Sequence, residues 1–190
     1  MFPLTSDEKR FLLRLARQSL TAAVGKQLPD GPAELPPALH EPTGVFVSLH
    51  QRDATEEALR GCVGFLEPRL PLWRAVCEAA AAAALEDPRF SPVRSEELAV
   101  LEVEISVLST SWPIDPENIQ IGLHGLIVTE GRIRGLLLPQ VAAEHQWSAE
   151  QFLEQTCCKA GLRPDAWRHG AQIEAFTAEV FGEISLLGEP

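Results

Sequence analysis

The sequence contains no tyrosine, a single methionine and no long apolar run. Its longest uninterrupted apolar stretch, residues 79–85, is far shorter than the roughly 20 residues of a membrane-spanning helix. Charged residues at positions 7–10 stand ahead of the first apolar pattern, which is not the order found in a secretory signal peptide. We therefore expect a soluble protein with no membrane partner.

Basic residues are the scarcer charged class, with 16 lysines and arginines against 27 aspartates and glutamates, and the formal net charge is -11. A field of that sign repels phosphate backbones, so nucleic acid could bind only at a locally basic patch. The nearest approach to such a patch is Arg132 and Arg134, which fit a solvated strand face. The sequence therefore predicts no nucleic-acid partner.

The four cysteines lack paired spacing, and the sequence contains no CxxC, CxxxCxxC or HExxH motif. These absences argue against a zinc ribbon, a motif-bound iron–sulfur cluster and a secreted disulfide framework. We expect a reduced, cytoplasmic protein without a metal site, and the sequence identifies no cofactor. Adjacent Cys157 and Cys158 fit either a strained vicinal disulfide or, more commonly, two helix residues facing different ways. With Cys77 they have helical core spacing, which predicts packing residues.

The apolar periodicity predicts helices and strands in mixed order. Thr5 and Glu8 have capping-box spacing ahead of the first helical pattern. Prolines between residues 29 and 42 predict a connecting loop without regular structure. Glu130 and Gly131 form a tight-turn pair between two strands. The predicted helices cover residues 5–20, 70–85 and 148–161, with a helical turn at 95–98, and the predicted strands cover residues 44–50, 58–66, 101–107, 126–129, 133–138 and 173–181.

This order of elements favours an α+β fold with a mainly antiparallel sheet flanked by helices. Hairpins are present, whereas a regular βαβ alternation and internal repeats are absent. A chain of 190 residues can bury a substantial core, as one domain or as one domain with a smaller lobe.

The best candidate site in the sequence is the segment around Arg60 and Cys62. In an extended strand these two side chains point to the same face, while Gly61 and Gly64 leave room for a backbone or a ligand. A guanidinium beside a thiol stabilises the thiolate and can bind an anion, so the pair predicts a nucleophile with an acidic substrate or a simple anion site. The alternative, which residue types alone favour, is a buried Cys62, an Arg60 in a surface ion pair and glycines at a β-bulge.

Seven sequence blocks, in order along the chain, resemble the AMMECR domain family, also called AmmeMemoRadiSam system protein A. The blocks are GVFVSLH, LRGCVGF, DPRF, EISVLS, GLHGLIV, RGLLLPQVA and FLEQTCCKAGL, and the match covers about residues 7–183. Val63 stands where the family usually has isoleucine, a difference of one methylene. The resemblance implies a single AMMECR-type domain over residues 1–190, with a larger and a smaller lobe around a groove lined by the RGC segment.

The family's motifs fall on four further candidate site residues. His124 could orient a thiol or act as a general base, although a lone turn histidine is more often a structural hydrogen-bond partner. Glu104 could serve as an acid or base, or lie on a solvated strand face. Arg89 could add a second cation to an anion pocket, although its Asp-Pro turn also ends a helix. Gln140, at the end of a buried strand expected over residues 135–140, could form a hydrogen bond in the cleft.

The leading hypothesis is an enzyme or enzyme subunit that binds a small anionic molecule. Cys62 would be a nucleophile or redox thiol, Arg60 would lower its pKa and hold the anion, and His124 or Glu104 would transfer protons. The alternative is a non-catalytic binding or scaffold module for a Memo-like or radical SAM partner protein, partners that the family association implies. The expected ligand-contacting residues are Arg60, Gly61, Gly64, Arg89 and Gln140.

Overall fold

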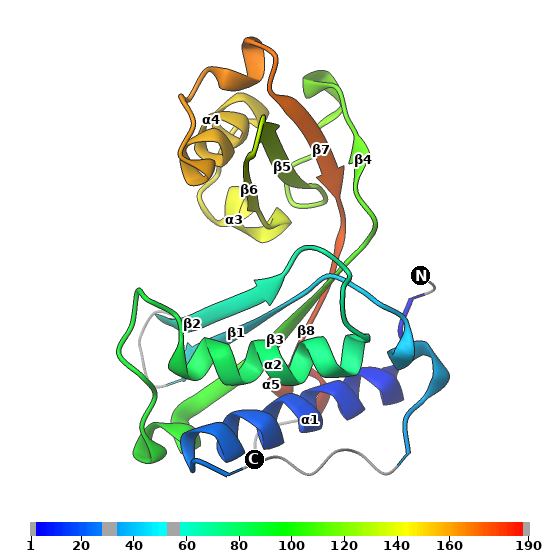
Figure 1. Ribbon diagram of the computed structural model, residues 1–190, viewed down its shortest axis with the longest axis vertical. Coiled ribbons are helices and arrows are strands. Elements are labelled where there is room, and N and C mark those ends of the chain that lie inside the picture. The colour runs from blue at the N-terminus through cyan, green and yellow to red at the C-terminus, as the bar shows by residue number, and fades with distance from the viewer. Residues whose placement is uncertain (1–2, 28–33, 53–57, 188–190) are drawn as a thin grey trace. The chain divides into compact units, whose positions relative to one another are not determined.

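The computed structural model describes residues 3–27, 34–52 and 58–187, and the chain forms two compact units (Figure 1). Unit 1 consists of Met1–Val107 and Glu179–Pro190, and unit 2 consists of Leu108–Ala178. Each unit has its own four-stranded sheet and its own helices. The predicted α+β class, with antiparallel sheets flanked by helices, is confirmed.

Unit 1 begins with helix α1 (Ser6–Val24), and the predicted capping box at its N-terminus is present. The Glu8 amide donates a hydrogen bond to the Thr5 hydroxyl at 3.3 Å, and the Thr5 amide donates to the Glu8 carboxylate at 2.8 Å. The first of these bonds satisfies an amide that the opening turn of a helix leaves without a helical partner. The buried residues of α1 are Leu12, Leu13, Leu15, Ala16, Ser19 and Leu20.

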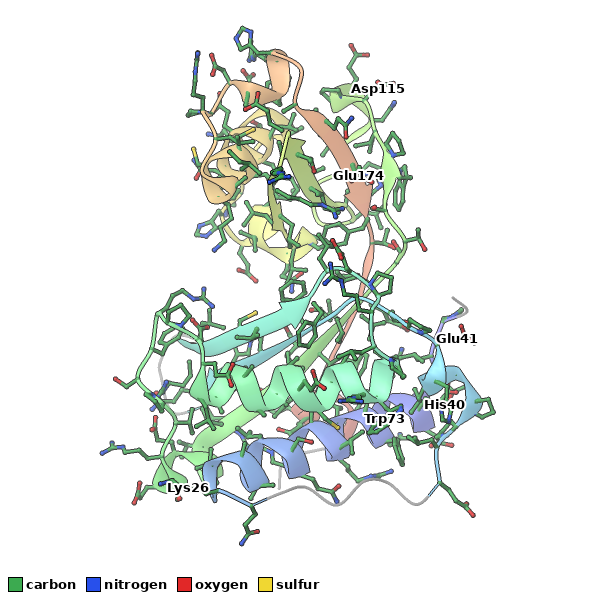
Figure 2. The ribbon with its side chains drawn as sticks, viewed as in Figure 1. Lys26, His40, Glu41, Trp73, Asp115 and Glu174 are labelled. Atoms are coloured by element: carbon green, nitrogen blue, oxygen red, sulfur yellow. The ribbon has the colours of Figure 1, made fainter. Side chains whose placement is uncertain are left out.

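The proline-rich segment contains a short regular element, which corrects the prediction of a loop without regular structure. Pro37–His40 form the 3-10 helix η1, because the φ angle of proline suits the start of a helical turn. The amide of Leu72, the first residue of helix α2 (Leu72–Leu85), donates a hydrogen bond to the carbonyl oxygen of Glu41 at 3.1 Å, so the end of η1 lies beside the start of α2 (Figure 2). The prolines within residues 28–33 lie outside the described part of the chain.

The sheet of unit 1 has the strand order β2-β1-β3-β8. The strands β1 (Val45–Gln51) and β2 (Ala58–Phe65) form the predicted antiparallel hairpin, and β1 also pairs antiparallel with β3 (Leu101–Leu108). The fourth strand, β8 (Ala178–Gly182), leads into the short helix α5 (Glu183–Leu187). The predicted helical turn before β3 is the 3-10 helix η2, which extends to residue 100.

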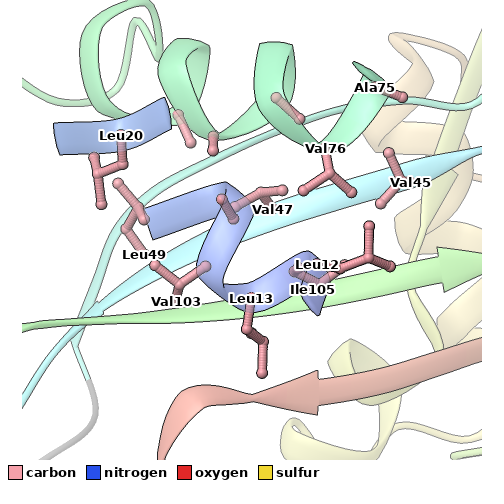
Figure 3. Close-up of a cluster of buried hydrophobic side chains, with 14 of the residues drawn as sticks. Leu12, Leu13, Leu20, Val45, Val47, Leu49, Ala75, Val76, Val103 and Ile105 are labelled. Atoms are coloured by element: carbon pink, nitrogen blue, oxygen red, sulfur yellow. The ribbon is translucent and has the colours of Figure 1, made fainter. Parts of the chain in front are cut away.

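Helices α1 and α2 pack against the same face of this sheet (Figure 3). Val45, Val47 and Leu49 of β1 point toward the helices, together with Val103 and Ile105 of β3. None of these five side chains is exposed, and removing such apolar surface from water is the main favourable term in folding. The alternate residues of the same strands therefore lie on the opposite face of the sheet.

The sheet of unit 2 has the strand order β4-β7-β5-β6. The predicted hairpin joins β5 and β6, and Gly131 in its turn has a φ of +60° that a residue with a side chain rarely adopts. Helix α4 begins at the predicted capping box of Ser148 and ends at Gly161, which is left-handed. The strands are β4 (Trp112–Pro113), β5 (Gly125–Glu130), β6 (Ile133–Leu137) and β7 (Gln172–Phe176), and the helices are η3 (Pro116–Asn118), α3 (Pro139–Glu144), α4 (Ala149–Ala160) and η4 (Ala166–Arg168).

The strand expected over residues 173–181 is two strands, β7 and β8, which belong to the sheets of different units. Thr177 separates them. Its carbonyl oxygen accepts a hydrogen bond from the Ser109 amide and its amide donates to the Ser109 hydroxyl, both at 2.9 Å. Alternating side chains indicate which face a residue occupies but not which strand it pairs with, so the pattern could not reveal this change of partner.

The expectation of a buried strand over residues 135–140 is wrong. The strand β6 ends at Leu137, and Pro139 starts helix α3, a position that proline favours. Because β6 is an edge strand, part of it faces solvent, and Ile133 is 46% exposed. The apolar run in the sequence therefore belongs to a half-exposed strand followed by a helix.

Candidate functional site

The candidate site lies on the face of the unit 1 sheet that points away from α1 and α2. Cys62 of β2 is the cross-strand partner of Ser48 of β1, and Ser48 is also paired with Glu104 of β3. Direct partners share a face, so a thiol, a hydroxyl and a carboxylate form one row across three strands. Within this row, Ser48 Oγ donates a hydrogen bond to Cys62 Sγ at 3.3 Å. Strand pairing thus brings together two predicted site residues and Ser48, which the sequence analysis missed.

The room left by the two glycines near Cys62 is taken by other parts of unit 1. A Cβ atom at Gly61 would lie 2.2 Å from the carbonyl oxygen of Ala83, because α2 packs directly on the backbone of β2. A Cβ atom at Gly64 would lie 2.5 Å from the ring of Phe46. Close approach of protein atoms, one of the two uses expected for these glycines, therefore accounts for both.

Arg60 occupies a bulge in β2, and its guanidinium is bound by the protein. The pairing of β1 with β2 shifts register between Leu49 and His50, opposite Arg60. Nε and Nη2 of Arg60 donate hydrogen bonds to the Glu97 carboxylate at 2.8 and 3.2 Å, and Nη1 donates to the carbonyl oxygen of Ser91 at 2.9 Å. The hydrogen bond from Arg60 lowers the pKa of the Glu97 carboxyl group. These contacts match the ion-pair alternative for Arg60.

The cation that contacts the Cys62 backbone is Arg89, which forms a pair with Asp87. The Cys62 amide donates a hydrogen bond to Asp87 Oδ2 at 2.8 Å. Arg89 donates to the same carboxylate through Nε at 3.0 Å and Nη2 at 2.7 Å, and Nη2 also lies 3.4 Å from the Cys62 carbonyl oxygen. The Asp87 side chain is 3% exposed, whereas that of Arg89 is 48% exposed. The positive charge beside Cys62 is therefore reachable from solvent.

The Cys62 thiol is neutral near pH 7, because burial raises its pKa. The Ser48 hydrogen bond and the positive charge of Arg89 oppose this rise, and the carboxylates of Asp87 and Glu104 add to it. Burial therefore outweighs the cationic lowering of the Cys62 pKa that the sequence analysis expected. The guanidinium that favours the thiolate is Arg89.

His50 is a further residue of this face that the sequence analysis missed. It follows Ser48 by two positions on β1, and its Nε2 lies 4.0 Å from Glu104 Oε1. Within the described residues, Nε2 is buried and has no hydrogen-bond partner. The alternation of Phe46, Ser48 and His50 with buried apolar residues is the signal that could have placed His50 here.

His124 and Gln140 belong to unit 2, and each is described within that unit. His124 is buried, its Nδ1 accepts a hydrogen bond from the Gln120 amide at 3.2 Å, and its ring packs edge-on against Trp112. Gln140 lies in the first turn of α3, and its Oε1 is buried without a hydrogen-bond partner among the described residues. These contacts of His124 fit the alternative given in the sequence analysis, in which it is a structural hydrogen-bond partner in a turn. Its catalytic role stays a prediction.

All four cysteines have free thiols, so the vicinal disulfide alternative for Cys157 and Cys158 does not apply. Cys157 is fully buried and packs as expected, whereas Cys158 is exposed on the next face of α4, which corrects its assignment to the core.

Among the described residues, no group of three or more histidine, cysteine or acidic side chains could hold a metal ion. No helix in the described part of the chain combines the length and apolarity needed to cross a membrane.

Comparison with known proteins gives consistent matches over nearly the full chain. The family model described as AMMECR1 matches residues 13–181. A protein of Thermofilum pendens is 43% identical, covering 98% of this chain and 94% of its own length, and one of Thermococcus gammatolerans is 46% identical, covering 96% and 94%. The crystal structure of an uncharacterised protein from Pyrococcus horikoshii matches with a TM-score of 0.88 and 42% identity, covering 94% of this chain and 93% of that one.

Proposed function

Because the chain belongs to the AMMECR1 family and carries Cys62 in a polar row of unit 1, we propose that it is an enzyme or enzyme subunit acting on a small anionic molecule through this thiol. The observation that supports the proposal most is the position of Cys62 between the Ser48 hydroxyl and the Asp87–Arg89 pair. A half-exposed arginine beside a thiol offers a charge to an anionic ligand and a nucleophile to its reactive atom.

Arg89 takes the anion-binding role in this proposal, and Arg60 holds the strand in place. The hydrogen bonds of Arg60 go to Glu97 and Ser91, so an incoming anion would have to displace a carboxylate that is already bound there. The charge of Arg89 is shared with Asp87 but its side chain is 48% exposed, so it can add a ligand without losing that partner. The anion would therefore bind next to Cys62.

Cys62 would react only after a ligand has bound, because the resting thiol is protonated. Glu104, in the same row of side chains, is the first candidate to receive the thiol proton, and His50 Nε2 lies beside its carboxylate. The thiol is thus a conditional nucleophile whose activation depends on the ligand.

Ligand screening followed by alkylation tests this proposal. Small organic anions are screened by thermal shift, and each stabilising compound is added to a Cys158→Ser protein during reaction with iodoacetamide. A ligand of the site should change the labelling rate of Cys62, measured by peptide mass spectrometry, and Arg89→Gln should abolish that change. Buried Cys157 on α4 is the control thiol, and its labelling should stay constant. A ligand whose stabilising effect is lost in the Arg89→Gln protein, but which leaves Cys62 labelling unaltered, would exclude the thiol role.

The alternative function is a non-catalytic binding module for a Memo-like or radical SAM partner protein. The raised pKa of Cys62 favours it, because a neutral thiol in a hydrogen-bonded row needs no chemistry to explain it. Cys62→Ala separates the two functions. If the folded variant keeps both partner binding and activity in cells, the protein is a binding module. If it keeps partner binding but loses activity, the Cys62 thiol takes part in a reaction.

A further inference from the structure

A cavity of about 350 Å³ lies in unit 1 where α1, the end of β1, η2 and α5 meet. Its lining includes Arg17, Arg52, Leu98, Glu183, Ile184 and Leu187. Cavities of this size hold small organic ligands in proteins. The lining residues do not include Cys62 or its partners, so an inference from this cavity does not depend on the function proposed above.

Arg17 and Glu183 form a fixed, neutral pair at the cavity. Arg17 Nε donates a hydrogen bond to Glu183 Oε1 at 2.9 Å, and its other nitrogens donate to the carbonyl oxygens of Leu98 at 3.1 Å and Leu101 at 2.7 Å. Glu183 Oε2 accepts a second bond from the Val103 amide at 2.9 Å. Since both side chains are already paired, they frame the cavity and leave it no net charge.

Among the described residues that line the cavity, Arg52 is the cation without a carboxylate partner. Its Nη2 donates a hydrogen bond to the Leu101 carbonyl oxygen at 3.1 Å, and no described carboxylate pairs with it. Its Nε is buried and, among the described residues, has no hydrogen-bond partner. A buried N–H donor without an acceptor is unfavourable, so this nitrogen indicates a missing acceptor.

The rest of the lining is apolar, and part of it is unusually exposed. Ile184 and Leu187 of α5 are 43% and 39% exposed although both are large aliphatic residues at the cavity. Leu98 completes an apolar wall. A ligand that covered this wall would remove hydrocarbon from water at the same time as it satisfied Arg52.

We propose that this cavity binds a small carboxylic acid with an apolar body, whose carboxylate accepts hydrogen bonds from Arg52 and whose hydrocarbon covers Ile184 and Leu187. A monoanion fits the charge, because among the described residues only the Arg52 guanidinium of the lining lacks a carboxylate partner, and one charge of a dianion such as phosphate would stay uncompensated. The apolar wall selects for chain length, so acetate should bind more weakly than hexanoate.

Isothermal titration of the full chain with hexanoate tests the site. Hexanoate should bind saturably and raise the melting temperature, while hexanol, acetate and inorganic phosphate should bind at least about tenfold more weakly, because each lacks either the monoanion or the apolar body. Arg52→Gln should lower the hexanoate affinity about tenfold or more through loss of one charge-assisted contact. Arg14→Gln, the same charge change at an exposed position of α1, is the control and should leave affinity unchanged.

Equal hexanoate affinity in the wild-type and Arg52→Gln proteins would overturn the proposal, as would phosphate binding more tightly than hexanoate. Leu187→Ser provides an independent test of the apolar wall and should weaken hexanoate much more than acetate. A protein that ends at Leu187 is titrated in parallel. If hexanoate binds only to that shortened protein, the chain's own last residues are the occupant and the proposal is wrong.

Discussion

Cys62 is held at the level of single residues by contacts on both faces of its strand and by a hydrogen bond of its backbone. On one face, the adjacent Gly61 lets α2 pack directly against the backbone of β2. On the other, Ser48 donates a hydrogen bond to the thiol, and in the plane of the sheet the Cys62 amide donates one to Asp87. The sulfur therefore has a defined position before any ligand binds, which is what a binding or catalytic thiol requires.

Gly61→Ala should destabilise unit 1 strongly. The added Cβ would lie 2.2 Å from the Ala83 carbonyl oxygen, and a backbone atom cannot move aside without shifting α2. We expect a loss of about 1–3 kcal/mol or more in the free energy of unfolding, measured by urea denaturation. Gly182→Ala is the matched control, because its nearest contact, at 3.0 Å, is the flexible end of the Glu102 side chain. Equal losses in the two variants would contradict this account.

The end of α2 and strand β2 are joined, at the level of elements, by one buried carboxylate. Asp87 follows α2 and accepts hydrogen bonds from the Cys62 amide of β2 and from Arg89. The hydrogen bond from Arg89 is the largest cause that holds the pKa of Asp87 well below its usual range. The Asp-Pro segment that the sequence analysis assigned to helix termination thus also fixes the candidate site.

The pH dependence of stability should reveal the Asp87 contact. Because the folded pKa of Asp87 is below the value of about 3.9 in an unfolded chain, its contribution is present above that value and is lost as pH falls toward the folded pKa. Asp87→Asn should cost about 1–3 kcal/mol at pH 7 and should make stability fall less steeply between pH 5 and pH 2. Urea denaturation across this range measures both effects. A variant with the wild-type slope would show that Asp87 is not the group responsible.

Unit 1 is discontinuous and unit 2 is continuous at the level of the whole molecule. The chain leaves the unit 1 sheet after β3 and returns to it at β8, and residues 108–178 lie between these neighbouring strands. Unit 2 has its own buried cluster, which includes Leu126, Phe152 and Leu153. The first segment of unit 1 lacks β8 when taken alone, and Arg17 then has no Glu183 to pair with.

Fragments should show this difference in continuity. Residues 108–178 alone should fold, because their core and sheet are complete, although a fragment of this size is only marginally stable. Residues 1–107 alone should be poorly folded, whereas residues 1–107 joined to 179–190 by a short glycine–serine linker should fold. Dispersed amide signals in NMR spectra and cooperative thermal unfolding check each case. A well-folded 1–107 fragment would show that β8 and α5 are dispensable.

Much of the fold follows from short-range patterns in the sequence. The capping boxes at Thr5 and Ser148, the left-handed Gly161 and the turn at Gly131 are determined by residues within a few positions, and all are present. The β1–β2 hairpin was also predicted, because its two strands are close in the chain. The division of residues 173–181 between two sheets was not, since pairing partners are chosen by segments far away in sequence.

The candidate site was predicted in part for the same reason. Cys62 and Glu104 were found from the sequence, and strand pairing places both in one row. The partner of Arg60 is Glu97, and the cation beside Cys62 is Arg89; both depend on how distant segments pack. Ser48 and His50 carry no local signal beyond their alternation in a strand, so only the pairing of β1 with its neighbours identifies them.

The sequence by itself determined the class of fold, the positions of the three longest helices (α1, α2 and α4), and the family of the chain. Those properties depend on periodicity, capping and motif order, which operate between residues near one another. Only the tertiary structure decided which charged groups pair, that burial raises the pKa of the Cys62 thiol, and that Arg52 Nε is buried without a hydrogen-bond partner among the described residues. Ion pairing and desolvation act through space, and burial depends on every segment that covers a group.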